Sequence, residues 1–158
     1  MACCCQTRTI IQAEKAPKAI GPYSHAVQAG HLLYTSGQLG IEPATGNLAA
    51  GGVEAETRQA LMNLQTILEA AGSSLAQVVK TTVFLRDIND FARMNAVYAT
   101  FFPQEPPARS AFQVAALPKA AAVEIEAVGV LSGDCECACH CDEDCPDDCD
   151  CDCHKHHD

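Results

Sequence analysis

No cysteine occurs between residues 6 and 134, although the 158-residue chain contains eleven. A disulfide framework for this central part is therefore excluded. No apolar run reaches the roughly 18 residues that a membrane-spanning helix needs. The beginning of the chain, MACCCQTRTI, lacks the charged and apolar regions of a signal peptide. Together these absences predict a cytoplasmic protein.

Basic charge is scarce as well, because ten Lys and Arg side chains face twenty Asp and Glu, a formal net charge of −10. Ten of the acids and a single lysine lie in residues 133–158, so the body of the chain is nearly neutral. Proteins that bind nucleic acids need a basic surface, and this body does not provide one. A nucleic-acid partner is therefore not expected.

The composition divides the chain into an N-terminal extension with cysteines (1–6), a domain (7–132) and an acidic tail rich in Cys and His (133–158). The central part is long enough to bury a hydrophobic core. Its patterns predict strands at 7–12, 26–29, 32–36, 78–85, 110–116 and 123–131, and helices at 53–71 and 90–102. This order predicts an α+β sandwich of two layers, with a mixed six-stranded sheet and two helices on one face.

Each helix has an apolar side and an expected end signal. In the first helix the apolar side is formed by Leu61, Leu64, Ile67, Leu68 and Ala71, with Gly72 as the C-terminal cap. In the second helix, Asp90 is the expected N-cap, and the apolar side comprises Phe91, Met94, Val97, Tyr98 and Phe101.

The strand at 110–116 has small residues on one side, which is typical of a sheet face that packs against another subunit rather than against water. The second face of the sheet is therefore expected to take part in oligomerisation.

Four segments are informative when taken together: AIGPYSHAV (19–27), YTSGQLG (34–40), VVKTTVFLRDINDFARMNAVYATFF (78–102) and PARSAFQVAALPKAAAVEIEAV (107–128). In this order and spacing they resemble the YjgF/RidA (Rid) family. The resemblance implies a chorismate-mutase-like α+β sandwich. It also implies a homotrimer in which the sheets line an inner barrel and three clefts lie between the subunits.

Two charged residues are the candidate catalytic pair. Arg109 has the planar donor fork that suits a carboxylate, although a surface arginine or a structural ion pair would give the same pattern. Glu124 lies on the same side of a strand as Glu126, and either could be an edge charge. The resemblance implies that Arg109 binds the substrate carboxylate and that Glu124 positions the attacking water. Both groups are then expected in one wall of a groove between subunits, with Glu126 structural.

The resemblance also implies a set of substrate-binding residues: Tyr23, Ser36, Gly37, Asn95 and Ala111, the last through its backbone. Taken alone, each has a simpler explanation, such as a packed loop aromatic for Tyr23, a strand end for Ser36 and Gly37, and a polar helix residue for Asn95. Two positions depart from the family, namely Pro106, where an aromatic is frequent, and His25, where glutamine is common. His25 is not expected to be the general base, because the family works without a histidine there.

The activity that the resemblance implies is the hydrolysis of reactive 2-enamine or 2-imino acids of the 2-aminoacrylate type to 2-keto acids and ammonia. It would make the chain a 2-iminobutanoate/2-iminopropanoate deaminase that needs no cofactor. The alternative is a non-catalytic member of the family, with a ligand-binding, chaperone-like or RNA-directed translation-inhibiting role. The intact pair of Arg109 and Glu124 favours the enzyme.

The tail, residues 133–158, contains Cys-x-Cys repeats and no aliphatic residue larger than alanine, so no core is expected there. Its composition resembles a short metallothionein and predicts binding of Zn²⁺, Cd²⁺ or Cu⁺. An acidic tail whose cysteines bind nothing specific is the alternative. Cys3, Cys4 and Cys5 could join a metal site, be acylated or be idle. The candidate ligands are Cys135, Cys137, Cys139, Cys141, Cys145, Cys149, Cys151, Cys153, His140 and His154.

Overall fold

The computed structural model describes residues 8–131. Two α-helices and six strands follow one another in the order expected. One additional short strand, β4, brings the number of strands to seven. The elements are β1 (Arg8–Ile11), β2 (Ala26–Ala29), β3 (Leu32–Thr35), β4 (Gln38–Leu39), α1 (Val53–Ala70), β5 (Val78–Leu85), α2 (Phe91–Phe101), β6 (Ala108–Gln113) and β7 (Val123–Val130).

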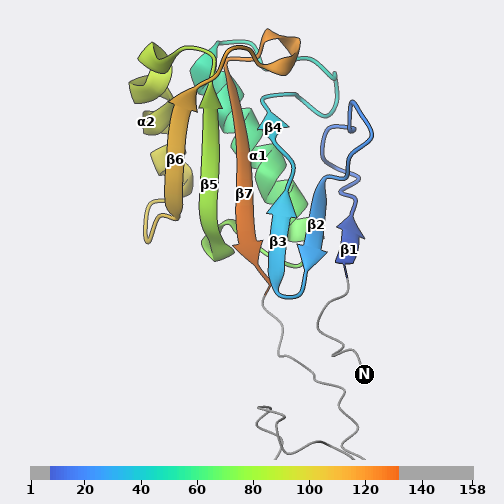
Figure 1. Ribbon diagram of the computed structural model, residues 1–158. Coiled ribbons are helices and arrows are strands. Elements are labelled where there is room, and N and C mark those ends of the chain that lie inside the picture. Colours follow the sequence, from blue (N-terminus) through green and yellow to red (C-terminus); the bar gives the residue numbers. More distant parts are fainter. Residues whose placement is uncertain (1–7, 132–158) are drawn as a thin grey trace, which may run out of the picture.

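A mixed sheet forms one layer and the two helices form the other, as the sequence predicts (Figure 1). The strand order is β1-β2-β3-β7-β5-β6, and all neighbours are antiparallel except β5 and β6. The expected six strands make up this path, and β4 pairs beside it with β7 as a seventh. β4 was not predicted, because its two residues are too few to display an alternation.

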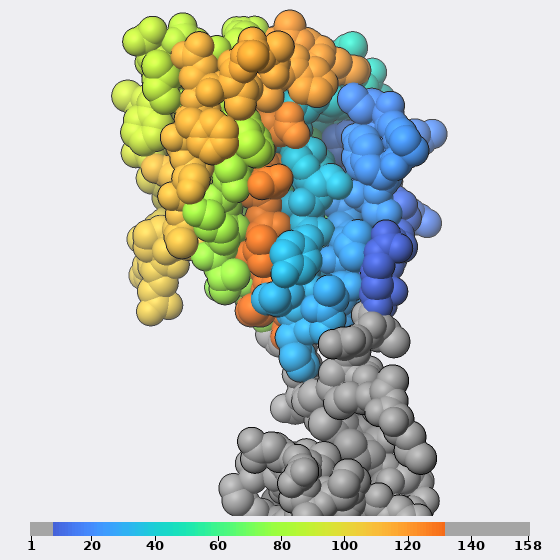
Figure 2. Space-filling view, in the orientation of Figure 1, coloured from blue at the N-terminus to red at the C-terminus, as the bar shows by residue number. Residues whose placement is uncertain are grey.

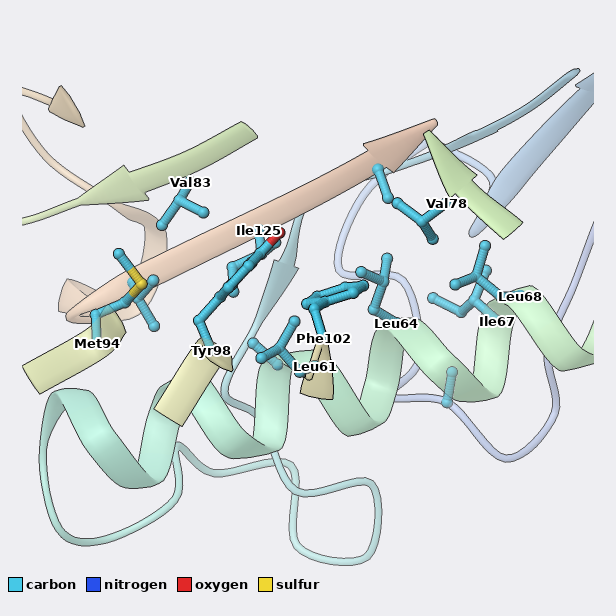
Figure 3. Packing of buried hydrophobic residues seen from close by; sticks show 14 of the residues in the cluster. Leu61, Leu64, Ile67, Leu68, Val78, Val83, Met94, Tyr98, Phe102 and Ile125 are labelled. Atoms are coloured by element: carbon cyan, nitrogen blue, oxygen red, sulfur yellow. The ribbon is translucent and has the colours of Figure 1, made fainter. Parts of the chain in front are cut away.

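The core lies between the sheet and the helices (Figure 3). The apolar side of α1 was predicted correctly, since Leu61, Leu64, Ile67 and Leu68 are all fully buried. Figure 3 shows these side chains directed from α1 toward Ile125 of β7 and Val78 of β5. Gly72 ends the helix with a φ of 78°, a left-handed conformation that suits glycine.

Helix α2 follows the prediction less closely. Met94, Val97 and Tyr98 are buried as expected, but Phe91 at the start of the helix is 39% exposed. Asp90 is the N-cap residue, yet its side chain caps no backbone N–H and instead accepts a hydrogen bond from Arg93 at 3.2 Å. The prediction of a capping side chain was wrong because Asp90 ends a short 3-10 helix, Ile88–Asp90, and has helical backbone angles rather than the extended ones of a capping residue.

Strand β6 begins and ends earlier than predicted, at Ala108 and Gln113 instead of 110 and 116. Its partner β5 ends at Leu85, which is paired with Gln113, so the ladder has no partner for the residues that follow. β6 is the last strand of the sheet order and therefore an edge strand.

No helix from residues 8–131 covers the second face of the sheet, and Figure 2 looks directly onto this face. Exposed aromatic and aliphatic side chains lie on this open face, including Leu32 and Tyr34 of β3 and Phe112 of β6. Glu124 and Glu126 of β7 share this face, because strand alternation and pairing place them beside Phe84 and Thr82. Among residues 8–131, no helix is both long and apolar enough to cross a bilayer.

Candidate functional site

One pocket, here called the Glu124 pocket, contains four of the predicted site residues. It has a volume of about 240 Å³, and its lining includes Tyr23, Ser36, Gly37 and Glu124. One wall comes from the connection between β1 and β2, which also contributes Pro17, Lys18 and Ile20. The opposite wall comes from the end of β3, from β4 and from Ile41. These four residues therefore meet in space although a hundred positions separate the first from the last.

Local hydrogen bonds fix the two walls of the Glu124 pocket. The hydroxyl of Ser36 donates to the backbone oxygen of Ser24 at 2.6 Å, and its N–H donates to the backbone oxygen of His25 at 2.9 Å. The hydroxyl of Tyr23 accepts the backbone N–H of Ile20 at 3.2 Å, and the ring remains 43% exposed. The serine hydroxyl is thus committed to the backbone and acts in the wall rather than as a free nucleophile.

Glu124 approaches Gly37 so closely that a Cβ at position 37 would overlap its carboxylate. Burial raises the pKa of Glu124 above its usual value, and the like charge of Glu126 raises it further. Within residues 8–131, no side chain or backbone group donates a hydrogen bond to this carboxylate. It is consequently available to hold a proton or a water molecule in the pocket.

A second pocket, here called the Arg109 pocket, has a volume of about 300 Å³ and lies between α2 and β6. The guanidinium of Arg109 donates to the side-chain oxygen of Asn95 at 2.7 Å. Its central carbon lies 4.5 Å from the ring centre of Tyr98 and 5.7 Å from that of Phe91. These contacts orient the fork while leaving its positive charge without a carboxylate partner among the described residues.

Tyr98 is a member of this arrangement that the sequence reasoning missed, because it was assigned only to the apolar side of α2. Its hydroxyl shares a 2.7 Å hydrogen bond with that of Thr81 on β5. Burial raises its pKa, although the hydrogen bond to Thr81 and the charge of Arg109 partly oppose this. The available signal was spacing, since Asn95 and Tyr98 are three positions apart on a helix and share a side of it.

Arg109 and Glu124 do not meet within one chain. Arg109 pairs with Thr81 on the face that the helices cover, whereas Glu124 pairs with Phe84 and points to the open face. Within one subunit the two groups therefore share no wall, and the expected groove between subunits stays a prediction. Ala111, the last predicted substrate-binding residue, lies on edge strand β6 and packs half-buried against the core.

The predicted metal ligands of the tail lie outside the described residues. Within residues 8–131, no group of three or more His, Cys, Asp or Glu side chains is placed so that it could hold a metal ion.

Comparison with known sequences identifies the family. Residues 13–131 match the family described as endoribonuclease L-PSP, to which the YjgF and RidA proteins belong. The chain belongs to this family. The human protein named 2-iminobutanoate/2-iminopropanoate deaminase is 53% identical over 123 residues, which cover 78% of this chain and 90% of the human protein. The mouse protein of the same name is 54% identical over the same length, covering 91% of its own chain.

Solved structures of the L-PSP family agree with the fold. The YjgF gene product of Escherichia coli superposes with a TM-score of 0.74 at 48% identity, covering 77% of this chain and 98% of that one. Escherichia coli TdcF, crystallised with bound serine, gives a TM-score of 0.75 at 45% identity, covering 78% and 99%. The chain thus spans nearly the whole length of these two structures, and residues 132–158 lie beyond the family match.

Proposed function

We propose that this chain hydrolyses 2-imino acids, in the manner of a 2-iminobutanoate/2-iminopropanoate deaminase. The observation that carries the proposal is that relatives of this name share more than half of their residues with the chain over nine-tenths of their length. The two charged groups that the reaction needs, a free guanidinium and a free carboxylate, are both present in pockets.

Arg109 is proposed to bind the carboxylate of the substrate. A guanidinium donates two parallel hydrogen bonds to a carboxylate, and here no acid of residues 8–131 competes for them. The ring of Tyr98 and the side chain of Asn95 hold the fork in one orientation. This orientation would fix C2 of the substrate relative to the attacking water.

Glu124 is proposed to direct the water. In its ionised form the carboxylate accepts a proton from the water as the oxygen adds to C2 of the imine, and it passes this proton to the imine nitrogen, which gives a carbinolamine. The carboxylate then transfers the proton of the carbinolamine hydroxyl to the nitrogen, which leaves as ammonia while the C2 oxygen becomes the carbonyl of the 2-keto acid. Because an imine is already electrophilic, this acid-base assistance and the positioning are sufficient, and no cofactor takes part.

Since the two groups face opposite sides of the sheet, we propose that each site is completed between neighbouring subunits of a homotrimer. Arg109 would come from one subunit and Glu124 from the next. Support comes from the exposed apolar side chains on the open face, which suit burial against another copy of the chain.

Arg109→Ala is the direct test of the proposed reaction. An amino-acid oxidase generates 2-iminobutanoate, and formation of the keto acid above the uncatalysed rate is measured. We expect the variant to lose at least about 100-fold in kcat/KM, because a charged hydrogen-bonding pair at a reacting centre is lost. Arg93→Ala is the matched control, since Arg93 is half exposed in an ion pair with Glu54. Full activity of the Arg109 variant would refute its role, and an inactive wild type would refute the deaminase.

For the tail we propose a separate binding function for soft metal ions. The specific observation is that residues 133–158 contain eight cysteines and four histidines, with repeated Cys-x-Cys spacing. Native mass spectrometry with added Zn²⁺ tests this on the whole chain, with a chain ending at Leu131 as the control. We expect zinc on the whole chain alone. A whole chain without zinc would end the proposal.

The cytoplasmic location that the sequence indicates stays a prediction.

A further inference from the structure

His25 is a buried imidazole in the wall of the Glu124 pocket, with only 7% of its surface exposed. Both ring nitrogens form hydrogen bonds. The backbone N–H of Ala13 donates to Nδ1 at 3.0 Å, and Nε2 lies 2.9 Å from the backbone oxygen of Pro17. Because a carbonyl oxygen only accepts, Nε2 carries the proton, and Nδ1 must be unprotonated to accept from Ala13. The geometry therefore specifies a neutral ring and one tautomer.

This ring holds one wall of the Glu124 pocket in shape. Through Ala13 and Pro17 it holds the β1–β2 connection, the segment that supplies Ile20 and Tyr23 to one wall. Its own backbone oxygen accepts the N–H of Ser36 in the other wall at 2.9 Å. The side chain of His25 thus fixes the conformation of the first wall at the residue through which that wall is hydrogen-bonded to the second.

We propose that His25 is a positioning residue that sets the width of the Glu124 pocket and limits the deamination proposed above to its neutral form. The inference rests on that proposed function. With a volume of about 240 Å³ and apolar walls from Ile20, Leu39 and Ile41, the pocket fits imino acids with a short aliphatic side chain. His25 would therefore act on the capture of these substrates, through KM, without touching the reacting atoms.

Protonation removes one of the two hydrogen bonds. An imidazolium has two N–H donors and no acceptor, so the N–H of Ala13 would face another donor. Lowering the pH is the way to impose this change on the intact protein. The other titratable groups of the pocket are Lys18 and Tyr23 from the same connection and Glu124 from β7. Ser36, Gly37 and Gln38 contribute none.

His25→Gln is the decisive variant, because an amide can accept from Ala13 and donate to Pro17 but does not titrate. His31→Gln is the matched control, since His31 lies exposed in the β2–β3 turn. For each chain, KM and kcat for 2-iminobutanoate are measured from pH 5.5 to pH 8.5. Glu124 is present in all three chains, so its titration by itself cannot produce a difference between their pH profiles.

We compare the ratio of KM at pH 5.5 to KM at pH 8.5. For the wild type this ratio should be at least about threefold larger than for the His25→Gln chain, with kcat less affected. The His31→Gln chain should follow the wild type. Identical pH profiles for all three chains would overturn the inference. His25→Leu, which offers neither hydrogen bond, should raise KM about fivefold or more at every pH.

A spectroscopic readout separates this inference from the proposed function. Long-range proton–nitrogen correlation spectra report the tautomer of each histidine, and the signal of His25 is the one that His25→Gln removes. We expect a neutral ring with the proton on Nε2 at pH 7.5. If the wild type has this tautomer but no deaminase activity, the proposed function fails alone. A proton on Nδ1 at that pH would overturn the role of His25, whatever the activity.

Discussion

Glu124 combines two properties that rarely favour stability. It is a half-buried carboxyl group, and it shares the open face of β7 with a second acid, Glu126. Both surroundings disfavour its ionised form and raise its pKa above the usual value. A carboxyl group in such surroundings is more easily ionised in the unfolded chain than in the folded one. Folding stability is therefore lost as the pH rises from the unfolded pKa through the folded one.

Glu124→Gln should for this reason remove activity and increase stability together. The amide cannot ionise, so the gain in Tm over the wild type should be larger at pH 8 than at pH 4, where the wild-type carboxyl is largely protonated. Thermal unfolding at both pH values and at one fixed chain concentration measures the difference. An equal gain at both pH values would contradict the raised pKa.

Glu126→Gln provides the matched control for this prediction. It removes the like charge but leaves Glu124 in place, so the pKa of Glu124 should fall toward its usual value. The acid limb of kcat/KM should then move to lower pH, while activity at pH 8 depends on whether Glu126 contacts substrate. If the acid limb of kcat/KM moved to higher pH, the effect of Glu126 on the pKa of Glu124 would have the opposite sign.

The connection between β3 and β4 has a glycine for a steric reason rather than a conformational one. Gly37 does not have a positive φ, so its backbone would accept any residue. A Cβ there would lie 2.9 Å from Cγ of Glu124 and would overlap the carboxylate itself. The β3–β4 connection thus brings its backbone against the carboxylate of Glu124, and the absence of a side chain at Gly37 makes room for this carboxylate in the pocket.

Gly37→Ala should consequently displace the carboxylate of Glu124 without unfolding the sheet. We expect kcat/KM to fall at least about tenfold, as misplacement by about an ångström typically costs, with the circular dichroism spectrum unchanged. Gly129→Ala is the matched control on β7, because a Cβ there meets Leu68 at 3.4 Å, an ordinary contact. If both variants keep full activity, the close approach has no bearing on catalysis.

At the scale of elements, periodicity predicted both helices and six of the strands. The errors occurred where backbone conformation or strand pairing decides the outcome. Asp90 has helical backbone angles and does not cap α2, and β6 ends where β5 no longer offers a partner. The end of β6 could not be predicted from its own segment, because it depends on a strand that lies elsewhere in the chain.

The candidate site also shows how far one segment of sequence can predict an arrangement in space. Alternation correctly placed Glu124 and Glu126 on one side of β7. It could not relate that side to the side of Arg109 on β6, since the relative phase of two strands is set by their register. Resemblance supplied the identity of the residues, whereas the division into two pockets required the structure. Tyr98 and the ring of His25 gained their meaning only from contacts across the fold.

At the scale of the molecule, the two pockets lie on different sides of the sheet. Arg109 belongs to β6 at one edge, and β5 lies between that strand and the strand of Glu124. A contact that brings the β6 edge of one subunit to the Glu124 pocket of the next joins two different surfaces. Contacts of this kind close into a ring when the rotation between subunits permits, and three subunits would then form three equal sites.

Mixed trimers test this arrangement most directly. Chains with Arg109→Ala and chains with Glu124→Gln should each be inactive alone. If every site takes its arginine and its glutamate from different subunits, a trimer containing both kinds of chain has one site with both groups intact. Coexpression with two affinity tags and purification through both should therefore restore about a third of the wild-type rate per trimer. If both groups acted within one subunit, each site would lack one of them and the mixed trimers would stay inactive. The restored rate thus depends on whether each site takes its two groups from different subunits, whichever neighbour supplies the glutamate.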